Sequence, residues 1–160
     1  MGGVASLPSR LSPVAWAVPR INVETFIYGS EDIGRPVADA LPERARAGVN
    51  VNVLLECVGS AKMEQAYVDE IKAAGVEVLK YHPPHWSHLG RLNNRTHRKL
   101  LVVDGRIGFT GGVGMSQHWT GNAQDPDHWR DTHVTVEVPV AAQMQTVFRD
   151  NVSTSTASVL

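Results

Sequence analysis

The sequence has 160 residues, of which 42% are hydrophobic and 19% charged, so it fits one folded domain and argues against a disordered chain. A net charge of −1 excludes a globally basic nucleic-acid-binding protein, but it is compatible with a locally basic cleft. A single cysteine, Cys57, excludes a disulfide framework within the chain.

Residues 1–20 contain three prolines and no run of about 20 apolar residues, so we expect a poorly ordered leader rather than a membrane span. Residues 21–29 alternate and are rich in β-branched and aromatic side chains, which predicts a strand. Residues 32–48 have helical periodicity, with a possible break at Pro42. A buried strand over 49–59 and a helix over 61–75 follow.

A short strand over 76–81 completes a strand–helix–strand–helix–strand series. This order predicts an α/β fold with a mixed, mostly parallel sheet and helices on both faces. Residues 82–96 read as a long polar loop.

The second half is expected to continue the sheet. Residues 97–104 and 106–112 look like two strands joined by a tight Asp104-Gly105 turn. A loop with one helical turn over 115–129 precedes a strand over 130–138 and an amphipathic helix over 141–151. We therefore expect one domain over 21–151 and a disordered tail over 152–160.

The stretch "HRKLLVVDGRIGFTGG" at 97–112 carries the chemistry. On a strand, His97 and Lys99 point to the same face, so two basic groups emerge together at its end. Such a pair suits a phosphate diester, with Lys99 as fixed charge and His97 as a nucleophile or acid–base group. Gly111 and Gly112 would let the backbone approach the anion. The alternative is a hairpin that merely has a charged mouth.

The spacing of these residues resembles the signature of the phospholipase D superfamily, His-x-Lys-x4-Asp followed, after six intervening residues, by two glycines. The segments "RLNNRTHRKLLVVDGRIGFTGG", "DHWRDTHVTVE", "VETFIY" and "ERARAGVNVNVLL" are similar to the bacterial cardiolipin synthase-like branch. The resemblance covers about residues 21–150.

The resemblance implies that His97 forms a phosphohistidine or protonates the leaving alcohol, and that Lys99 holds phosphate oxygens. Asp104, the third motif residue, is expected to be structural or orienting because it lies at the hairpin turn. Asp131 matches an acidic residue that orients the motif histidine, although pairing with its neighbour Arg130 is the alternative. Asn94 is a further candidate for lining the site. No cofactor and no metal are implied.

Two features depart from the family. Gly114 stands where many members have an asparagine that helps to bind phosphate, so Gln117 or a backbone N–H would have to replace it. The chain also holds one motif, whereas the synthases carry two. We expect either a homodimer or, as the favoured interpretation, the N-terminal half of a longer enzyme.

Three functions stay open. The first is phosphatidyl transfer or phospholipase D action on a phosphatidylglycerol-like lipid, in the cytoplasm or at the surface of the cytoplasmic membrane. The second is a homodimeric nuclease or phosphodiesterase, and the third is an inactive half-domain with a binding or assembly role.

Other residues invite weaker interpretations. His82, His85 and His88 are spaced by three, but Pro83 and Pro84 prevent the helix that would align them on a metal. Trp86 and Leu89 could touch an acyl chain, and Trp119 and Trp129 could rim the pocket. We expect ordinary loop and strand contacts for the remaining histidines, His118, His128 and His133.

Overall fold

A computed structural model describes residues 19–25, 34–57, 60, 65–81, 96–113 and 117–157. The expectations for the leader, for Asn94, for Gly114 and for the loop that contains His82, His85, His88, Trp86 and Leu89 lie outside the described residues.

The first half of the chain forms the predicted alternation of strands and helices. The elements are β1 (Arg20–Thr25), α2 (Gly34–Arg46), β2 (Asn50–Glu56), α3 (Gln65–Ala73) and β3 (Glu77–Tyr81). α2 runs through Pro42 without a break, and Gly48, with a φ of 87°, follows its end.

The second half forms β4 (Leu100–Val103), β5 (Ile107–Gly111), a 3₁₀ turn η2 (Gln117–Thr120), β6 (His133–Glu137) and α4 (Val140–Ala157). Asp104 and Gly105 join β4 to β5 with φ values of 55° and 67°. Two successive positive φ values are typical of a tight hairpin turn, so the predicted Asp104-Gly105 turn is confirmed.

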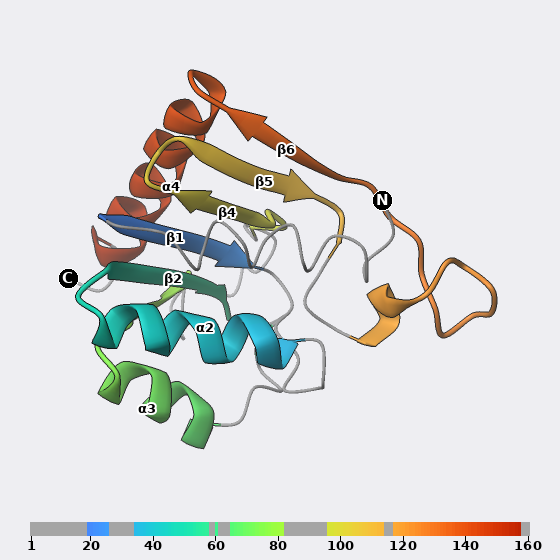
Figure 1. Ribbon diagram of the computed structural model, residues 1–160, viewed down its shortest axis with the longest axis horizontal. Helices are drawn as coiled ribbons and strands as arrows, with labels where there is room; N and C mark the ends of the chain where they lie inside the picture. Colours follow the sequence, from blue (N-terminus) through green and yellow to red (C-terminus); the bar gives the residue numbers. More distant parts are fainter. Residues whose placement is uncertain are drawn as a thin grey trace.

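The sheet is mixed rather than mostly parallel, and this part of the prediction is wrong. Its strand order is β3-β2-β1-β4-β5-β6 (Figure 1). The β1–β2 and β2–β3 pairs are parallel, whereas the β1–β4, β4–β5 and β5–β6 pairs are antiparallel. The two crossover helices make β1, β2 and β3 parallel, whereas the tight Asp104-Gly105 turn makes β4 and β5 antiparallel.

Helices cover both faces of this sheet, as predicted. On one face, Leu41 of α2 and Ile71 of α3 pack in a cluster with Val23, Val53 and Leu101. On the other face, Phe148 and Met144 of α4 pack against a second cluster formed by Leu54, Leu100 and Val102 (Figure 1). β4 is therefore buried on both sides, and the residues just before it are held at the end of an interior strand.

The last helix is longer than expected. α4 runs to Ala157, so the predicted disordered tail is wrong for residues 152–157. Val152 packs against the cluster around Phe148, and Ser155 is buried with its hydroxyl donating to the carbonyl of Asn151 at 2.7 Å. Tertiary contacts thus override the weak helical propensity of this Ser/Thr-rich segment.

Within the described part of the chain, no helix has the length and apolar character that crossing a membrane requires.

Candidate active site

His97 and Lys99 lie together just before β4, as the alternation predicts. The Nζ atom of Lys99 is 3.3 Å from Nε2 and 3.5 Å from Nδ1 of His97. The His97 side chain is exposed, whereas Lys99 is only 6% exposed. An ammonium held in the protein beside an accessible imidazole is a suitable arrangement for an anionic substrate.

Burial lowers the pKa of Lys99, because desolvation disfavours the charged ammonium, and the carboxylate of Asp131 opposes this by raising it. Asp131 is thus close enough to Lys99 to influence its charge. The two residues are 32 positions apart in the sequence. Lys99 immediately precedes β4, and Asp131 lies shortly before β6.

The glycine pair makes room for the segment that carries Asp131. A Cβ atom on Gly112 would lie 1.9 Å from Oδ2 of Asp131, and one on Gly111 would lie 2.2 Å from the carbonyl oxygen of Thr132. The N–H of Gly112 donates to that same carbonyl at 3.1 Å. We expected the glycines to let the backbone approach an anion, but the close approach in the structure is to residues 131–133.

Asp104 lies at the far end of the hairpin from His97. Its Oδ1 accepts a hydrogen bond from the N–H of Arg20 at 2.9 Å, and its own N–H donates to the carbonyl of Arg20 at 2.9 Å. At about 3.3 Å per residue, its Cα is roughly 16 Å from that of Lys99. These contacts join the hairpin turn to the start of β1, as expected of a structural residue.

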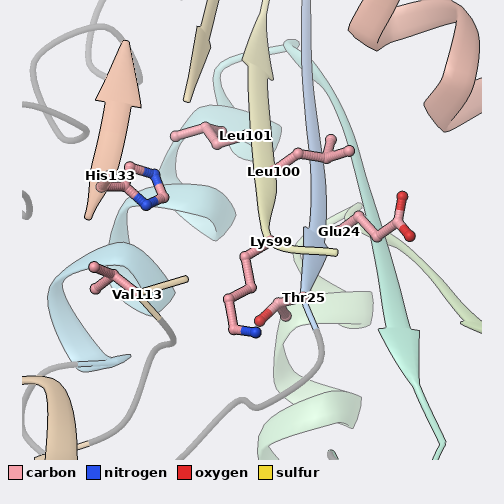
Figure 2. A pocket seen from close by; sticks show the side chains of 7 residues that line it. All are labelled: Glu24, Thr25, Lys99, Leu100, Leu101, Val113 and His133. Atoms are coloured by element: carbon pink, nitrogen blue, oxygen red, sulfur yellow. The ribbon is translucent and has the colours of Figure 1, made fainter. Parts of the chain in front are cut away.

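A small cavity of about 10 Å³ adjoins Lys99, close to the size of one water position. Figure 2 shows the Lys99 side chain ending beside Thr25, with His133 and Val113 on the other side of β4 from β1. The residues that line the cavity are Glu24, Thr25, Lys99, Leu100, Leu101, Val113 and His133.

His133 is a site residue that the sequence reasoning missed. It pairs with Gly111 across β5 and β6, which brings its ring to the level of Lys99. The sequence predicted that His133 lies on a strand over 130–138. Placing His133 beside Lys99 also required knowing that this strand pairs with the hairpin.

A second, open groove of about 480 Å³ begins at His97 and Arg98 and runs along α4. Its other lining residues include Val140, Met144 and Val147, and the two valines are 46% and 40% exposed. The groove therefore places apolar surface directly beside the exposed imidazole.

Trp119 and Trp129 pack on each other rather than in these two cavities. Their ring centroids are 4.8 Å apart in an edge-to-face arrangement, and His118 stacks on Trp129 at 5.0 Å. Nδ1 of His128 lies 2.6 Å from Oδ1 of Asp125, and this hydrogen bond lowers the pKa of Asp125. These contacts hold together residues 117–129 of the excursion, the long connection between β5 and β6.

No three His, Cys, Asp or Glu side chains of the described segments come together in a way that would hold a metal ion.

The chain resembles known proteins over nearly its whole length. The sequence profile of the family described as "Cardiolipin synthase, PLD-like domain" matches residues 16–151. The chain is 34% identical to the cardiolipin synthase of Geobacillus kaustophilus over 147 residues, which cover 91% of this chain and 29% of that protein. It thus spans less than a third of the length of that relative.

Two solved structures share the fold. The phosphatidylserine synthase of Haemophilus influenzae superposes with a TM-score of 0.71 at 13% identity, over 93% of this chain and 35% of that one. Nuc of Salmonella typhimurium, a phospholipase D family member, superposes with a TM-score of 0.66 at 14% identity, over 91% and 86%. The fold, the motif and the profile that covers most of the chain agree, and the chain belongs to the phospholipase D-like domain family of the cardiolipin synthases.

Proposed function

We propose that this chain supplies one half of a phosphodiester-transfer site that acts on phospholipids, in the manner of a cardiolipin synthase or phospholipase D. The observation that carries the proposal is the pairing of exposed His97 with buried Lys99, whose nitrogens are 3.3 Å apart. Lys99 neutralises a non-bridging phosphate oxygen while the His97 imidazole attacks phosphorus.

The reaction has two displacements. In the first, a bond forms between an imidazole nitrogen of His97 and phosphorus, the phosphorus–oxygen bond to the leaving alcohol breaks, and a general acid protonates that oxygen. In the second, an acceptor hydroxyl attacks phosphorus, the phosphorus–nitrogen bond breaks, and the acceptor proton passes to the same acid–base group. Water as acceptor gives hydrolysis, and a glycerol hydroxyl of phosphatidylglycerol gives cardiolipin.

The acid–base group of this scheme is a second motif histidine. One His-x-Lys pair with the required spacing to an Asp exists in this sequence. A nucleophile and an acid on opposite sides of phosphorus require two histidines. The second therefore comes from another copy of the chain or from a second catalytic half.

A phospholipid is the preferred substrate because of the groove beside His97. The groove offers Val140, Met144 and Val147 to an apolar group that continues from the phosphate. The net charge of −1 provides no general attraction for nucleic acid. The 34% identity to a cardiolipin synthase supports the same choice.

The test combines light scattering with incubation of the purified chain on phosphatidylglycerol vesicles. We expect a dimeric chain to release glycerol and form cardiolipin or phosphatidic acid, and to yield a phosphohistidine peptide containing His97. His97→Asn abolishes both signals, whereas His118→Asn, an exposed histidine that stacks on Trp129, retains them. A verified dimer that gives neither lipid product nor phosphohistidine would falsify the proposal.

A second candidate is a homodimeric phosphodiesterase that cleaves nucleic acid. It is favoured by the near-complete mutual coverage with Nuc, 91% of this chain and 86% of that one, although that likeness concerns the fold alone. Cleavage of DNA in the presence of EDTA, lost in His97→Asn, would support it over the lipid substrate. No DNA cleavage by a dimer that turns over lipid would exclude it.

A further inference from the structure

Glu24 is a buried carboxyl that the proposed reaction does not use. It is 1% exposed, and it lies on β1 opposite Leu100 of β4. Because side chains alternate along a strand, Glu24 faces α4 whereas its neighbour Thr25 faces the cavity beside Lys99. Figure 2 shows the Glu24 carboxyl directed away from Lys99.

The Glu24 carboxyl joins three segments of the chain. Its Oε1 accepts a hydrogen bond from the hydroxyl of Thr96 at 2.5 Å. The Asn151 side-chain amide of α4 donates to Oε1 at 3.1 Å and to Oε2 at 3.0 Å. Thr96 itself is buried, with 6% exposure.

Thr96 immediately precedes His97, and this position gives the contact a consequence for the site. The antiparallel ladder between β1 and β4 ends at the Glu24–Leu100 pair, so residues 96–99 lie beyond it. The buried hydrogen bond from Thr96 to the Glu24 carboxyl fixes the start of this segment, and the beginning of β4 at Leu100 fixes its other end. Lys99 and His97 are thereby held between two fixed points, Thr96 and Leu100.

We propose that Glu24 is a positioning residue for the His97-x-Lys99 pair, acting through Thr96, with Asn151 holding the carboxyl in place. Its catalytic consequence rests on the proposed phosphodiester transfer, whereas the positioning itself does not. In this role Glu24 acts through Thr96 rather than by contact with the substrate. It sets the direction in which the exposed imidazole leaves the sheet, and it keeps the Lys99 ammonium buried.

The competing explanation is that Glu24 and Asn151 only attach α4 to the sheet. Removing the Thr96 hydroxyl separates the two, because Thr96→Val keeps the side-chain shape and leaves the Asn151 contacts in place. Thr96→Ser restores the hydroxyl. Thr154→Val is a matched control, since the Thr154 hydroxyl donates to the carbonyl of Asp150 at 2.8 Å on the exposed side of α4.

The first measurement needs no substrate. Acetylation of Lys99 by acetic anhydride is followed by mass spectrometry and compared with the exposed Lys72 and Lys80 in the same molecule. Loss of one hydrogen bond to a carboxyl makes Lys99 react about tenfold faster in Thr96→Val, and Thr96→Ser and Thr154→Val react as the unmodified chain does. Amide hydrogen exchange at Val53 of β2 reports global opening.

Two results overturn the proposal. One is an unchanged Lys99 rate in Thr96→Val. The other is a Lys99 rate that rises only in proportion to exchange at Val53, which is the outcome of a purely structural role. Glu24→Gln, which keeps the volume of the side chain, is expected to raise the Lys99 rate in the same way, and Thr96→Val decides the question if that variant does not fold.

The second measurement uses the lipid reaction. Thr96→Val lowers kcat about tenfold while KM changes by less than about twofold, and Thr96→Ser restores kcat. Equal kcat values for the Val and Ser variants would contradict the catalytic part. If the unmodified chain turns over neither lipid nor any other diester, the proposed function fails, and the Lys99 acetylation rates still decide the positioning role.

Discussion

Gly112 and Asp131 approach so closely that a Cβ atom at position 112 would lie 1.9 Å from Oδ2 of the carboxylate. We predict that Gly112→Ala displaces Asp131 and lowers the melting temperature by several degrees, since overpacking costs about 1–3 kcal/mol. Gly108→Ala is the comparison, because its Cβ would meet only apolar side-chain atoms, Sδ of Met144 at 2.8 Å and Cγ2 of Val136 at 3.0 Å. Calorimetry checks both variants. Equal losses of stability in Gly112→Ala and Gly108→Ala would show that the contact between residues 112 and 131 contributes no more to stability than the contact at Gly108.

The carboxylate of Asp131 raises the pKa of Lys99 and so opposes the effect of burial. Asp131→Asn removes this effect, and the pKa of Lys99 falls further. If phosphate binds only when Lys99 is protonated, binding is then lost at a lower pH. The fall in phosphate affinity at alkaline pH therefore shifts toward neutrality. Asp127→Asn, in the exposed excursion, leaves this fall in affinity at the same pH.

The measurement is a titration of the Lys99 ε-methylene resonance together with inorganic phosphate binding over the alkaline range. A Lys99 pKa that does not fall in Asp131→Asn would contradict the electrostatic link. A shift of equal size in Asp127→Asn would show that the effect is general rather than local.

Local patterns predicted the hairpin and the pairing of its two basic residues. The Asp104-Gly105 dipeptide indicated a tight turn, and both residues have positive φ values. Alternation placed His97 and Lys99 on one side, and their nitrogens lie 3.3 Å apart. These features depend on residues close in sequence, which is why sequence reasoning reached them.

Long-range features were missed because no local pattern encodes them. Glu24 occupies a polar position of an alternating strand and would be assigned to solvent, yet α4 covers it through Asn151, 127 residues later in the chain. The strand order had the same limitation, because nothing within β4 states that it lies antiparallel beside β1. His133 enters the cavity at Lys99 only through the pairing of β5 with β6.

Asp104 provides a test of a motif residue that lies far from the imidazole. Asp104→Ala removes the acceptor for the Arg20 N–H and places alanine at a φ of 55°, so we expect a loss of about 1–3 kcal/mol of stability. Asp104→Asn keeps an acceptor oxygen and tolerates that φ, and it stays close to the unmodified chain. Urea unfolding measures the difference.

Activity per folded molecule completes this test. Both Asp104 variants keep the rate of phosphohistidine formation within about threefold, because the turn does not reach the reacting atoms. A stable Asp104→Asn variant that forms no phosphohistidine would instead give Asp104 a direct part in the chemistry.

A substitution in the groove beside His97 can distinguish recognition of a lipid from recognition of any phosphodiester. Val147 lines the groove and is 40% exposed, whereas Val134 of β6 is 46% exposed and is not among the groove-lining residues. We predict that Val147→Asn raises KM for long-chain phosphatidylglycerol about threefold to tenfold, with no change for a short water-soluble diester. Val134→Asn should leave both substrates unaffected, which makes it the matched control for exposure and chemistry.

Light scattering on the same samples identifies the groove's occupant. If Val147→Asn dissociates the dimer while long-chain and short-chain substrates lose activity equally, the groove binds the second copy of the chain rather than an acyl group. If the dimer is intact and only the long-chain reaction weakens, the apolar side chains of α4 contact the lipid. Because β4, β5, the excursion and β6 all lie between His97 and Val147 in the sequence, this result would also show that α4 contributes to the substrate site.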